Sequence, residues 1–212
     1  MDPDFRIAIV DYDCGNLFSI QRALHELGIK SFITKNADEI LASDKVILPG
    51  VGAFGDGMNS LRKQGLEDAV KKFAFSGKPL LGICLGMQLL MEESSEFGQH
   101  KGLGIVPGKV VRLQEKCHNG QRIKVPHIGW NDINFNISNP LFNGLNSGTY
   151  VYFLHSFCVS ASDTDYYVAK SAYGDNEFCA VIQKERIIGM QFHPEISGPA
   201  GLRLLENFIF NI

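Results

Sequence analysis

The sequence predicts an α/β fold: a flavodoxin-like, open and mostly parallel sheet with helices on both faces, extended by antiparallel strands in the C-terminal half. In the first ninety residues, short apolar runs alternate with segments of helical period. After about Gly98, β-like runs follow one another closely, with turn signals between them. The 212 residues contain no repeat and no convincing linker, so we expect a single domain over residues 1–212.

The first half alternates strands with helices. Apolar residues recur at helical spacing from Leu17 until Gly28 ends the helix. We expect strands at residues 6–10, 31–34, 45–48 and 80–83, and helices at residues 17–27, 37–42, 67–75 and 85–91. In parallel sheets of this kind, ligands bind at the carboxyl ends of the strands.

The second half is richer in strands. Turn signals such as Asn119-Gly120 and Asn143-Gly144 separate its apolar runs. We expect strands at residues 109–113, 122–126, 150–159, 166–172, 179–183 and 187–192, followed by a closing helix at residues 200–210. These strands are expected to continue the sheet of the first half.

Composition excludes several classes of partner. The formal net charge is −3 and the pI about 6.1, which leaves no electrostatic signature of nucleic-acid or membrane binding. The chain opens on an acidic Met1-Asp2-Pro3-Asp4, and no apolar run is long enough for a membrane span. The five cysteines are odd in number and widely spaced, which favours reduced thiols and a cytoplasmic protein.

Cys84 follows an apolar run, precedes a helical one and lies between two glycines, Gly82-Ile83-Cys84-Leu85-Gly86. This places its thiol on a tight strand-to-helix turn of the kind that presents a nucleophile. The N-terminus of a helix also favours the thiolate. Taken alone, the pentapeptide fits a small buried cysteine beside packing glycines equally well.

A histidine and a carboxylate stand at the end of a later strand, in His193-Pro194-Glu195. In extended backbone, residues two apart project to the same side, so Glu195 is expected to accept a hydrogen bond from the His193 imidazole. Such a pair supplies the base and the orienting group that a cysteine nucleophile requires. By itself the tripeptide is better explained as a strand running into a turn, but together with the Cys84 turn it predicts a catalytic triad.

A glycine-rich loop, residues 48–55, follows the third strand of the first half. With the backbone N–H of Leu85, it is suited to supplying oxyanion donors for a tetrahedral intermediate. A phosphate-binding or connecting loop is the alternative, although the lysine and hydroxyl of a P-loop are missing. Cys117-His118 with His127 lacks the paired ligand spacing of a zinc site, so we expect no metal and no cofactor.

These motifs resemble the signatures of the class I (triad) glutamine amidotransferases. The first resemblance is Gly82 to Gln88 together with His193 to Glu195. More narrowly, five segments resemble the glutaminase subunits of imidazole glycerol phosphate synthase: Asp11-Tyr12, Gly15-Asn16-Leu17, residues 49–54, residues 126–131 and residues 152–156. The matches extend in the expected order from the first strand to Glu195.

The resemblance implies hydrolysis of L-glutamine through a cysteine thioester. It assigns Cys84 as nucleophile, His193 as acid and base, Glu195 as the group that orients it, and Gly52 and Leu85 as oxyanion donors. The substrate-binding residues implied are Gly50, Gln88, Glu96, His155, Ser156 and Phe157. The peptide around residues 50–52 is further expected to flip when the partner is loaded, which would leave the glutaminase nearly silent alone.

The resemblance also implies a heterodimer with a cyclase subunit of (β/α)8-barrel type, which uses the ammonia to form imidazole glycerol phosphate and AICAR in histidine biosynthesis. Asn16, Trp130, Tyr152 and Ile196 are the expected interface residues. Family members generally carry lysine where this chain has Ile196, so the expected interface loses a charge.

Ile196 keeps a second interpretation open: a paralogous glutaminase that supplies ammonia to an amidotransferase of surface-polysaccharide sugar synthesis. A non-catalytic regulatory subunit on the same fold is a third interpretation, against which the complete Cys84, His193 and Glu195 set argues. A peptidase or γ-glutamyl hydrolase suits residues 49–54 and 126–131 poorly.

Overall fold

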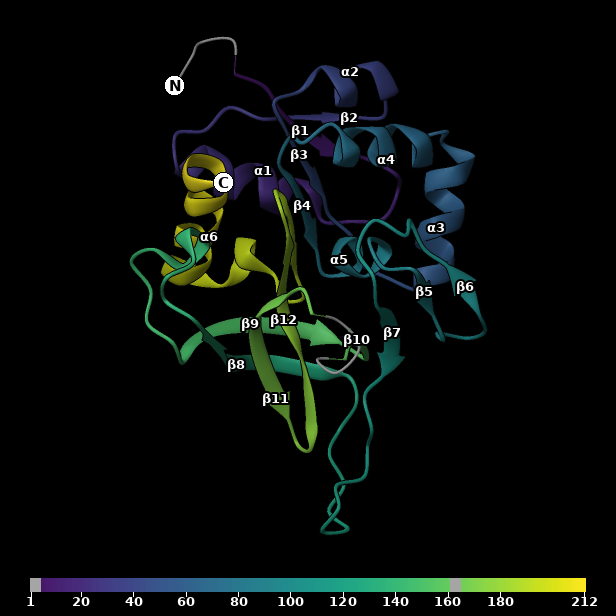
Figure 1. Ribbon diagram of the computed structural model, residues 1–212, viewed down its shortest axis with the longest axis vertical. Helices are drawn as coiled ribbons and strands as arrows, with labels where there is room; N and C mark the ends of the chain where they lie inside the picture. Colours follow the sequence, from purple (N-terminus) through teal and green to yellow (C-terminus); the bar gives the residue numbers. More distant parts are fainter. Residues whose placement is uncertain (1–4, 161–164) are drawn as a thin grey trace.

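A nine-stranded mixed sheet organises the computed structural model, which describes residues 5–160 and 165–212 (Figure 1). Residues 1–4, on which the expected lack of a targeting segment partly rests, lie outside the described residues. The strand order is β2-β1-β3-β4-β13-β12-β11-β8-β9. The first five strands are parallel and the remaining pairings are antiparallel, which confirms the predicted fold class.

The parallel strands are short, and all of them except the partly buried edge strand β2 are buried along their whole length, as strands covered on both faces must be. They are β2 (Phe32–Thr34), β1 (Ile7–Val10), β3 (Lys45–Leu48), β4 (Leu80–Ile83) and β13 (Ile187–Met190). β13 comes more than a hundred residues after β4 in the chain and pairs with it from Ile187↔Leu80 to Met190↔Ile83. This pairing brings the last motif of the chain next to the Cys84 turn.

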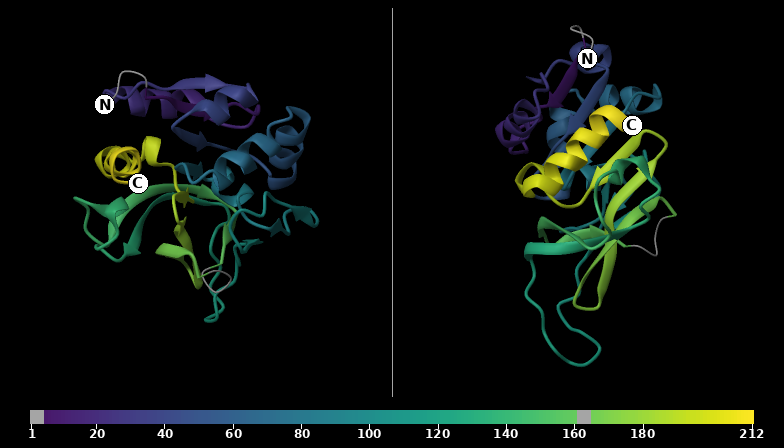
Figure 2. Two further views of the ribbon diagram at one scale, coloured as in Figure 1. Left: turned by 45° about the horizontal axis from the view of Figure 1, so that its top comes forward. Right: turned by 90° about the vertical axis from the view of Figure 1, so that its left-hand side faces the viewer.

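Helices cover both faces of the parallel strands. Successive residues of β1 alternate between two cores, with Ala8 and Val10 on one face and Ile7 and Ile9 on the other. The first face is covered by α2 (Ala37–Ala42), α3 (Phe54–Lys63), α4 (Glu67–Phe75) and α5 (Leu85–Leu89). The second is covered by α1 (Leu17–Glu26) and α6 (Gly198–Asn211), which lie side by side (Figure 2).

The antiparallel part extends the sheet and adds a second one. β12 (Asn176–Lys184), β11 (Tyr167–Tyr173), β8 (His127–Phe135) and β9 (Thr149–His155) continue from β13. The second sheet has the order β10-β7-β5-β6, formed by β10 (Phe157–Val159), β7 (Lys109–Arg112), β5 (Glu93–Ser94) and β6 (His100–Lys101). Two 3₁₀ turns, η1 (Pro140–Phe142) and η2 (Pro194–Ile196), precede β9 and α6.

Three sequence-based expectations need correction. The strand expected at residues 122–126 is wrong: the strand is β8, and only Arg122 makes a bridge, to Lys116. The run expected at residues 150–159 is two strands in different sheets, divided at Ser156. A helix that we did not expect, α3, begins at Phe54 inside the glycine-rich segment.

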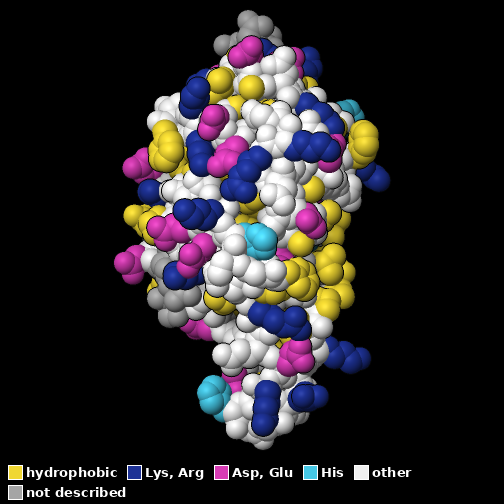
Figure 3. Space-filling model, turned by 90° about the vertical axis from the view of Figure 1, so that its right-hand side faces the viewer, with side chains coloured by type: hydrophobic (Ala, Val, Ile, Leu, Met, Phe, Trp, Pro, Cys, Tyr) yellow, Lys and Arg dark blue, Asp and Glu magenta, His cyan; other side chains and the backbone are white. Residues whose placement is uncertain are grey.

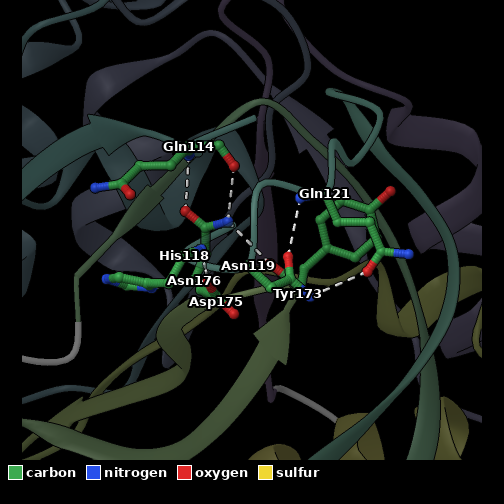
Figure 4. Close-up of polar contacts among 7 residues, drawn as sticks. All are labelled: Gln114, His118, Asn119, Gln121, Tyr173, Asp175 and Asn176. Atoms are coloured by element: carbon green, nitrogen blue, oxygen red, sulfur yellow. Dashed lines mark hydrogen bonds and ion pairs between the residues drawn. The ribbon is translucent and has the colours of Figure 1, made fainter. Parts of the chain in front are cut away.

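The segment between β7 and β8 extends away from the rest of the molecule (Figure 1) and carries exposed Lys and Arg side chains at its tip (Figure 3). Polar contacts connect it to the turn between β11 and β12 (Figure 4). Asn176 Oδ1 accepts a hydrogen bond from the Gln114 N–H at 2.7 Å, and its Nδ2 donates to the Gln114 carbonyl at 3.0 Å. Asp175 accepts from the His118 N–H at 2.5 Å.

The strand-to-helix turn at Cys84 depends on the glycines beside it. A Cβ on Gly86 would overlap the carbonyl oxygen of Leu48, and a Cβ on Gly82 would lie 2.8 Å from the backbone of Gly86. At both positions a side chain would therefore clash with neighbouring backbone. The close approach of Gly86 to β3 leaves α5 directly above the end of the sheet.

Gly86→Ala is expected to destabilise the fold by about 3 kcal/mol or more, because the obstacle to the new Cβ is backbone. Urea denaturation monitored by circular dichroism measures the change. Gly15→Ala is the control, because its Cβ would meet only ordinary van der Waals contacts. Equal stabilities of the two variants would contradict the assigned close approach.

Candidate active site

The backbone of Cys84 adopts an uncommon conformation, with φ 52° and ψ −108°, directly before α5. Positive φ is strained for a residue with a Cβ, and such strain is found at sites where a side chain must be aimed. The Cys84 N–H donates to the Met190 carbonyl at 2.7 Å, and the Cys84 carbonyl accepts from the Gln88 N–H at 3.1 Å. The expected turn is therefore present, and β13 holds it.

His193 and Glu195 form the expected buried pair. His193 Nδ1 and Glu195 Oε1 are 2.9 Å apart, although η2 begins between the two residues and the backbone is not extended throughout. Burial acts to lower the pKa of His193, but the Cys84 sulfur and the Glu195 carboxylate outweigh it and raise that pKa to about 10. The imidazole is thus held protonated at neutral pH. Its Nε2 is buried without a hydrogen-bonding partner among the described residues.

A cavity of about 120 Å³ opens beside Cys84. Gly52, Leu85 and Gln88 line it, together with Val51, Glu96, Leu154, His155 and Ser156. Two of the predicted substrate-binding residues, Gly50 and Phe157, are not part of this lining. A larger cavity, of about 740 Å³, lies between β8 and β11, but its lining contains neither a cysteine nor a histidine, so the chemistry points to the smaller one.

The two predicted oxyanion donors are not both turned toward the cavity. The Leu85 N–H donates to the Gly50 carbonyl at 3.3 Å, so this donor is occupied. Tyr12 fixes the start of the loop, since its hydroxyl donates to the Pro49 carbonyl at 2.6 Å. Burial raises the pKa of Tyr12 well above its usual value, so the hydroxyl remains a donor. Gly52, at φ 112°, has a backbone conformation that a residue with a Cβ rarely adopts.

Glu96 lies at the N-terminus of α3, where its Oε2 accepts a hydrogen bond from the Phe54 N–H at 2.6 Å. A carboxylate is stabilised at this end of a helix, because the first N–H groups have no partner within the helix. Glu96 also lines the cavity, so it can act both as a cap of α3 and as a binding group. The capping role was not expected from the sequence.

Two buried histidines lie opposite each other on paired strands: His155 on β9, which lines the cavity, and His127 on β8. Burial lowers the pKa of His127 to about 4, and burial together with the nearby His127 lowers that of His155 to about 3. Both rings are therefore neutral, which determines their tautomers. His155 Nδ1 donates to the Phe157 carbonyl at 3.0 Å, and its bare Nε2 accepts from His127 Nδ1 at 3.2 Å.

The predicted interface residues Asn16, Trp130, Tyr152 and Ile196 are exposed or half-buried. Trp130 on β8 is 55% exposed and meets Tyr152 on β9 edge to face, with ring centroids 6.0 Å apart. Ile196, 44% exposed, ends η2 directly after Glu195. Asn16 is exposed and caps α1, where its side chain accepts from the Ser19 N–H at 3.4 Å.

Sequence reasoning missed several groups that hold the site. Ser197 is buried, donates to the His193 carbonyl at 2.7 Å and accepts from the Tyr152 N–H at 2.9 Å, which joins η2 to β9. Gln191 is buried beside the Cys84 sulfur. For Gln191, the sequence offered one signal: it is a polar residue at the end of an apolar strand that leads into His193-Pro194-Glu195.

The weak metal candidate does not assemble. His118 is exposed and pairs with Asp175, at 2.8 Å between Nδ1 and Oδ2 (Figure 4). His127 is instead stacked between Phe153 and Tyr173. Over residues 5–160 and 165–212, no group of three or more His, Cys, Asp or Glu side chains is arranged to hold a metal ion. The same ranges contain no helix long and apolar enough to cross a membrane.

Comparison with known proteins gives one family. Residues 8–212 match the sequence model of the family described as glutamine amidotransferase class-I. Several curated relatives are described as imidazole glycerol phosphate synthase subunit HisH. The one from Sulfurimonas denitrificans is 48% identical, over 95% of this chain and 96% of the relative. The one from Wolinella succinogenes is 46% identical, over 95% of this chain and 98% of the relative. A third, from Syntrophotalea carbinolica, is 44% identical over 95% of this chain and 98% of the relative.

Solved structures show the same fold at lower sequence identity. A structure described as PurLQS from Thermotoga maritima superposes with a TM-score of 0.70 at 22% identity, covering 97% of both chains. Another, described as a glutamine amidotransferase, superposes with a TM-score of 0.72 at 21% sequence identity, covering 95% of this chain and 96% of the other.

The neutral histidine pair is expected to make stability fall in mild acid. Unfolded histidine takes up a proton near pH 6.5, whereas His127 and His155 stay neutral until about pH 4 and 3. Below pH 6.5 the unfolded chain binds more protons, so each residue lowers the free energy of unfolding by up to about 1.4 kcal/mol per pH unit. His127→Phe should reduce this slope between pH 6.5 and 4, measured by urea unfolding. The exposed His25→Phe should leave it unchanged, and equal slopes for both variants would contradict the assignment.

Proposed function

Because the chain belongs to the class I glutamine amidotransferase family, we propose that the cavity beside Cys84 is where it hydrolyses L-glutamine to glutamate and ammonia. The enzyme is the glutaminase subunit of an imidazole glycerol phosphate synthase and works in histidine biosynthesis. The observation that carries the site assignment is the strained Cys84 turn, held by β13 beside the His193–Glu195 pair.

In the first half-reaction, Cys84 attacks as the thiolate that the protonated His193 holds beside it. The sulfur lone pair forms a bond to the carboxamide carbon, and the carbonyl π electrons move onto oxygen. When the tetrahedral intermediate collapses, the C–N bond breaks and Nε2 of His193 gives its proton to the leaving nitrogen. The raised pKa of His193 supports this role, because the proton is in place before the attack.

In the second half-reaction, the neutral His193 takes a proton from water as the oxygen attacks the thioester. The C–S bond then breaks, which releases glutamate, and the regenerated thiolate lies again beside a protonated imidazole. Glu195 orients the ring throughout, since its Oε1 accepts from Nδ1 and so directs Nε2 to the reacting groups.

The loop over Leu85 explains why the isolated subunit would be slow. The Gly50 carbonyl occupies the Leu85 N–H, so an oxyanion there would meet an oxygen in place of a free donor. Tyr12 fixes Pro49, and Glu96 fixes Phe54, so only the four residues between these clamps are free to turn. Rotation of the peptide after Gly50 would free Leu85 and turn the N–H of the same peptide, that of Val51, to where the carbonyl oxygen was. The predicted donor, the Gly52 N–H, belongs to the next peptide and would have to turn with it.

The cavity lining supports a pose for glutamine. Nε2 of Gln88 already donates to the Phe157 carbonyl at 2.8 Å, so its Oε1 is the atom left to accept from the substrate. The Glu96 carboxylate is suited to bind the α-ammonium group, while the backbone at His155 and Ser156 lines the place for the α-carboxylate. Phe157 acts from behind this lining through Gln88 and His155.

The partner is the cyclase subunit, which we infer to be a (β/α)8-barrel that forms a heterodimer with this chain. Ile128, Trp130 and Leu154 are exposed on the outer face of β8 and β9, next to Ile196 and the exposed Tyr150. The Leu154 carbonyl lies 3.7 Å from the Cys84 sulfur, so a subunit docked here would cover the exit of the cavity. Ammonia could then pass directly to the cyclase before it is protonated in water.

The remaining inferences concern the whole chain. Ile196 adds apolar area to the docking face, and this supports a contact with less charge than in relatives that carry lysine. The two core layers share one sheet, which supports a single domain over residues 1–212. All five cysteines lie in the described ranges and are thiols, which supports a cytoplasmic enzyme.

Cys84→Ala is expected to abolish glutaminase activity in the presence of the cyclase subunit and its substrate, because no other group can form the thioester. Ammonia release and covalent labelling by a glutamine-analogue electrophile measure the loss. Cys117→Ala, in the segment between β7 and β8, should retain both. Ammonia release by Cys84→Ala at more than about one thousandth of the wild-type rate would disprove the assignment.

Trp130→Ala is expected to weaken the complex with the cyclase subunit by about 2 kcal/mol, or roughly 30-fold in Kd, as truncation of a central aromatic anchor does. Titration calorimetry measures Kd. The exposed Phe75→Ala, at the end of α4 before β4 and so at the other end of the strands, is the control. Unchanged affinity for Trp130→Ala would place the docking face elsewhere.

A further inference from the structure

A chain of buried hydrogen bonds leads from a backbone carbonyl to the Cys84 sulfur. The Phe157 carbonyl accepts from Gln88 Nε2 at 2.8 Å. The same Nε2 donates to Gln191 Oε1 at 3.2 Å, and Gln191 Nε2 in turn donates to Cys84 Sγ at 3.8 Å. Both glutamines are buried, so water does not compete for these contacts.

The direction of every bond in this chain is determined by its first member. A carbonyl oxygen can only accept, so the group of Gln88 facing Phe157 must be its NH₂. That NH₂ has a second hydrogen, which makes the atom of Gln191 that faces it the oxygen. The NH₂ group of Gln191 is then the one that faces the sulfur. The opposite orientation would bring two NH₂ groups together and place an oxygen against a thiolate.

The backbone around Gln191 is equally fixed. Its N–H donates to the Ala180 carbonyl at 2.9 Å, and it follows β13 directly, between Met190, which holds the Cys84 N–H, and His193. One short segment thus supports the nucleophile through a backbone carbonyl, a side-chain amide and an imidazole.

We propose that Gln191 is a positioning residue that acts through Cys84: its amide donates a hydrogen bond to the thiolate, and Gln88 holds that amide in the donating orientation. The inference rests on the proposed function, since it concerns the same nucleophile. A donor on the side chain of Gln191 stabilises the thiolate and directs its remaining lone pairs to the cavity. Gln88 accordingly does two things, since its Nε2 orients Gln191 while its Oε1 is left for the substrate.

The test measures alkylation of Cys84 in the full-length chain by iodoacetamide, followed by mass spectrometry of the Cys84 peptide. Gln191→Met keeps the size of the side chain and removes the donor. At pH 6.5 its alkylation should slow about tenfold, in line with the loss of a hydrogen bond to a charged group, and the difference should shrink toward pH 9, where fewer protons compete for the sulfur. A residue needed only for packing would not give this dependence on pH.

Gln183→Met is the matched control, because Gln183 lies on the neighbouring β12 and bonds to Asn139 and the Glu185 carbonyl, away from the sulfur. In this variant, iodoacetamide should alkylate Cys84 at the wild-type rate at every pH. If Cys84 is alkylated at the wild-type rate at every pH in a folded Gln191→Met variant, the proposal is overturned.

Should Gln191→Met fail to fold, the isosteric Gln191→Glu decides the matter. It keeps an oxygen toward Gln88 and places a carboxyl oxygen against the sulfur, so alkylation should be slowed more at pH 9 than at pH 6, and equal slowing overturns the proposal. The assay contains no glutamine, so its outcome is distinct from that of the proposed glutaminase activity. Loss of ammonia release with normal Gln191 dependence would refute only the proposed function.

Discussion

The backbone of Cys84 is the constraint on which the rest of the site depends. A residue with a Cβ at φ 52° and ψ −108° costs on the order of 1–3 kcal/mol, and the surroundings must impose it. Here the Cys84 N–H donates to a carbonyl of β13, and the Cys84 carbonyl accepts from an N–H of α5. Gly86 also lies so close to β3 that no side chain fits between them. The strain is thus offset by the pairing of strands in the core, and its effect is to direct one sulfur atom out of the sheet.

Burial acts to lower the pKa of all three histidines near that sulfur, but their partners leave them in different charge states. His127 and His155 have only each other and a carbonyl as partners, so they are neutral. His193 is buried too, but a carboxylate faces one nitrogen and a sulfur the other, and it is charged. The charged His193 ring is therefore buried together with two neutral histidine rings. The proton that is transferred in the reaction is thus held on His193 and not on His127 or His155.

Much of the fold and of the site was predictable because the signals are local. The Cys84 turn, the His193–Glu195 pair and the parallel strands follow from neighbouring residues and their period. β8 was missed because its pattern is inverted: Ile128 and Trp130 face outward, whereas His127 is buried. The start of α3 reads as loop because Gly55 and Gly57 are unfavourable in helices, yet a Cβ at Gly55 would lie 2.7 Å from the His100 ring. The orientation of Gln191 and the occupied Leu85 donor depend on contacts between distant segments, which no local pattern encodes.

The late position of β13 has a consequence for synthesis of the protein. The strand lies in the middle of the sheet, between β4 and β12, but it is one of the last elements to leave the ribosome. A nascent chain that has already folded the other four parallel strands still has a gap beside Cys84 and lacks His193 next to the thiol. Hydrolysis of glutamine must therefore await translation of β13 and of His193-Pro194-Glu195, and a chain that stops before them would be inert.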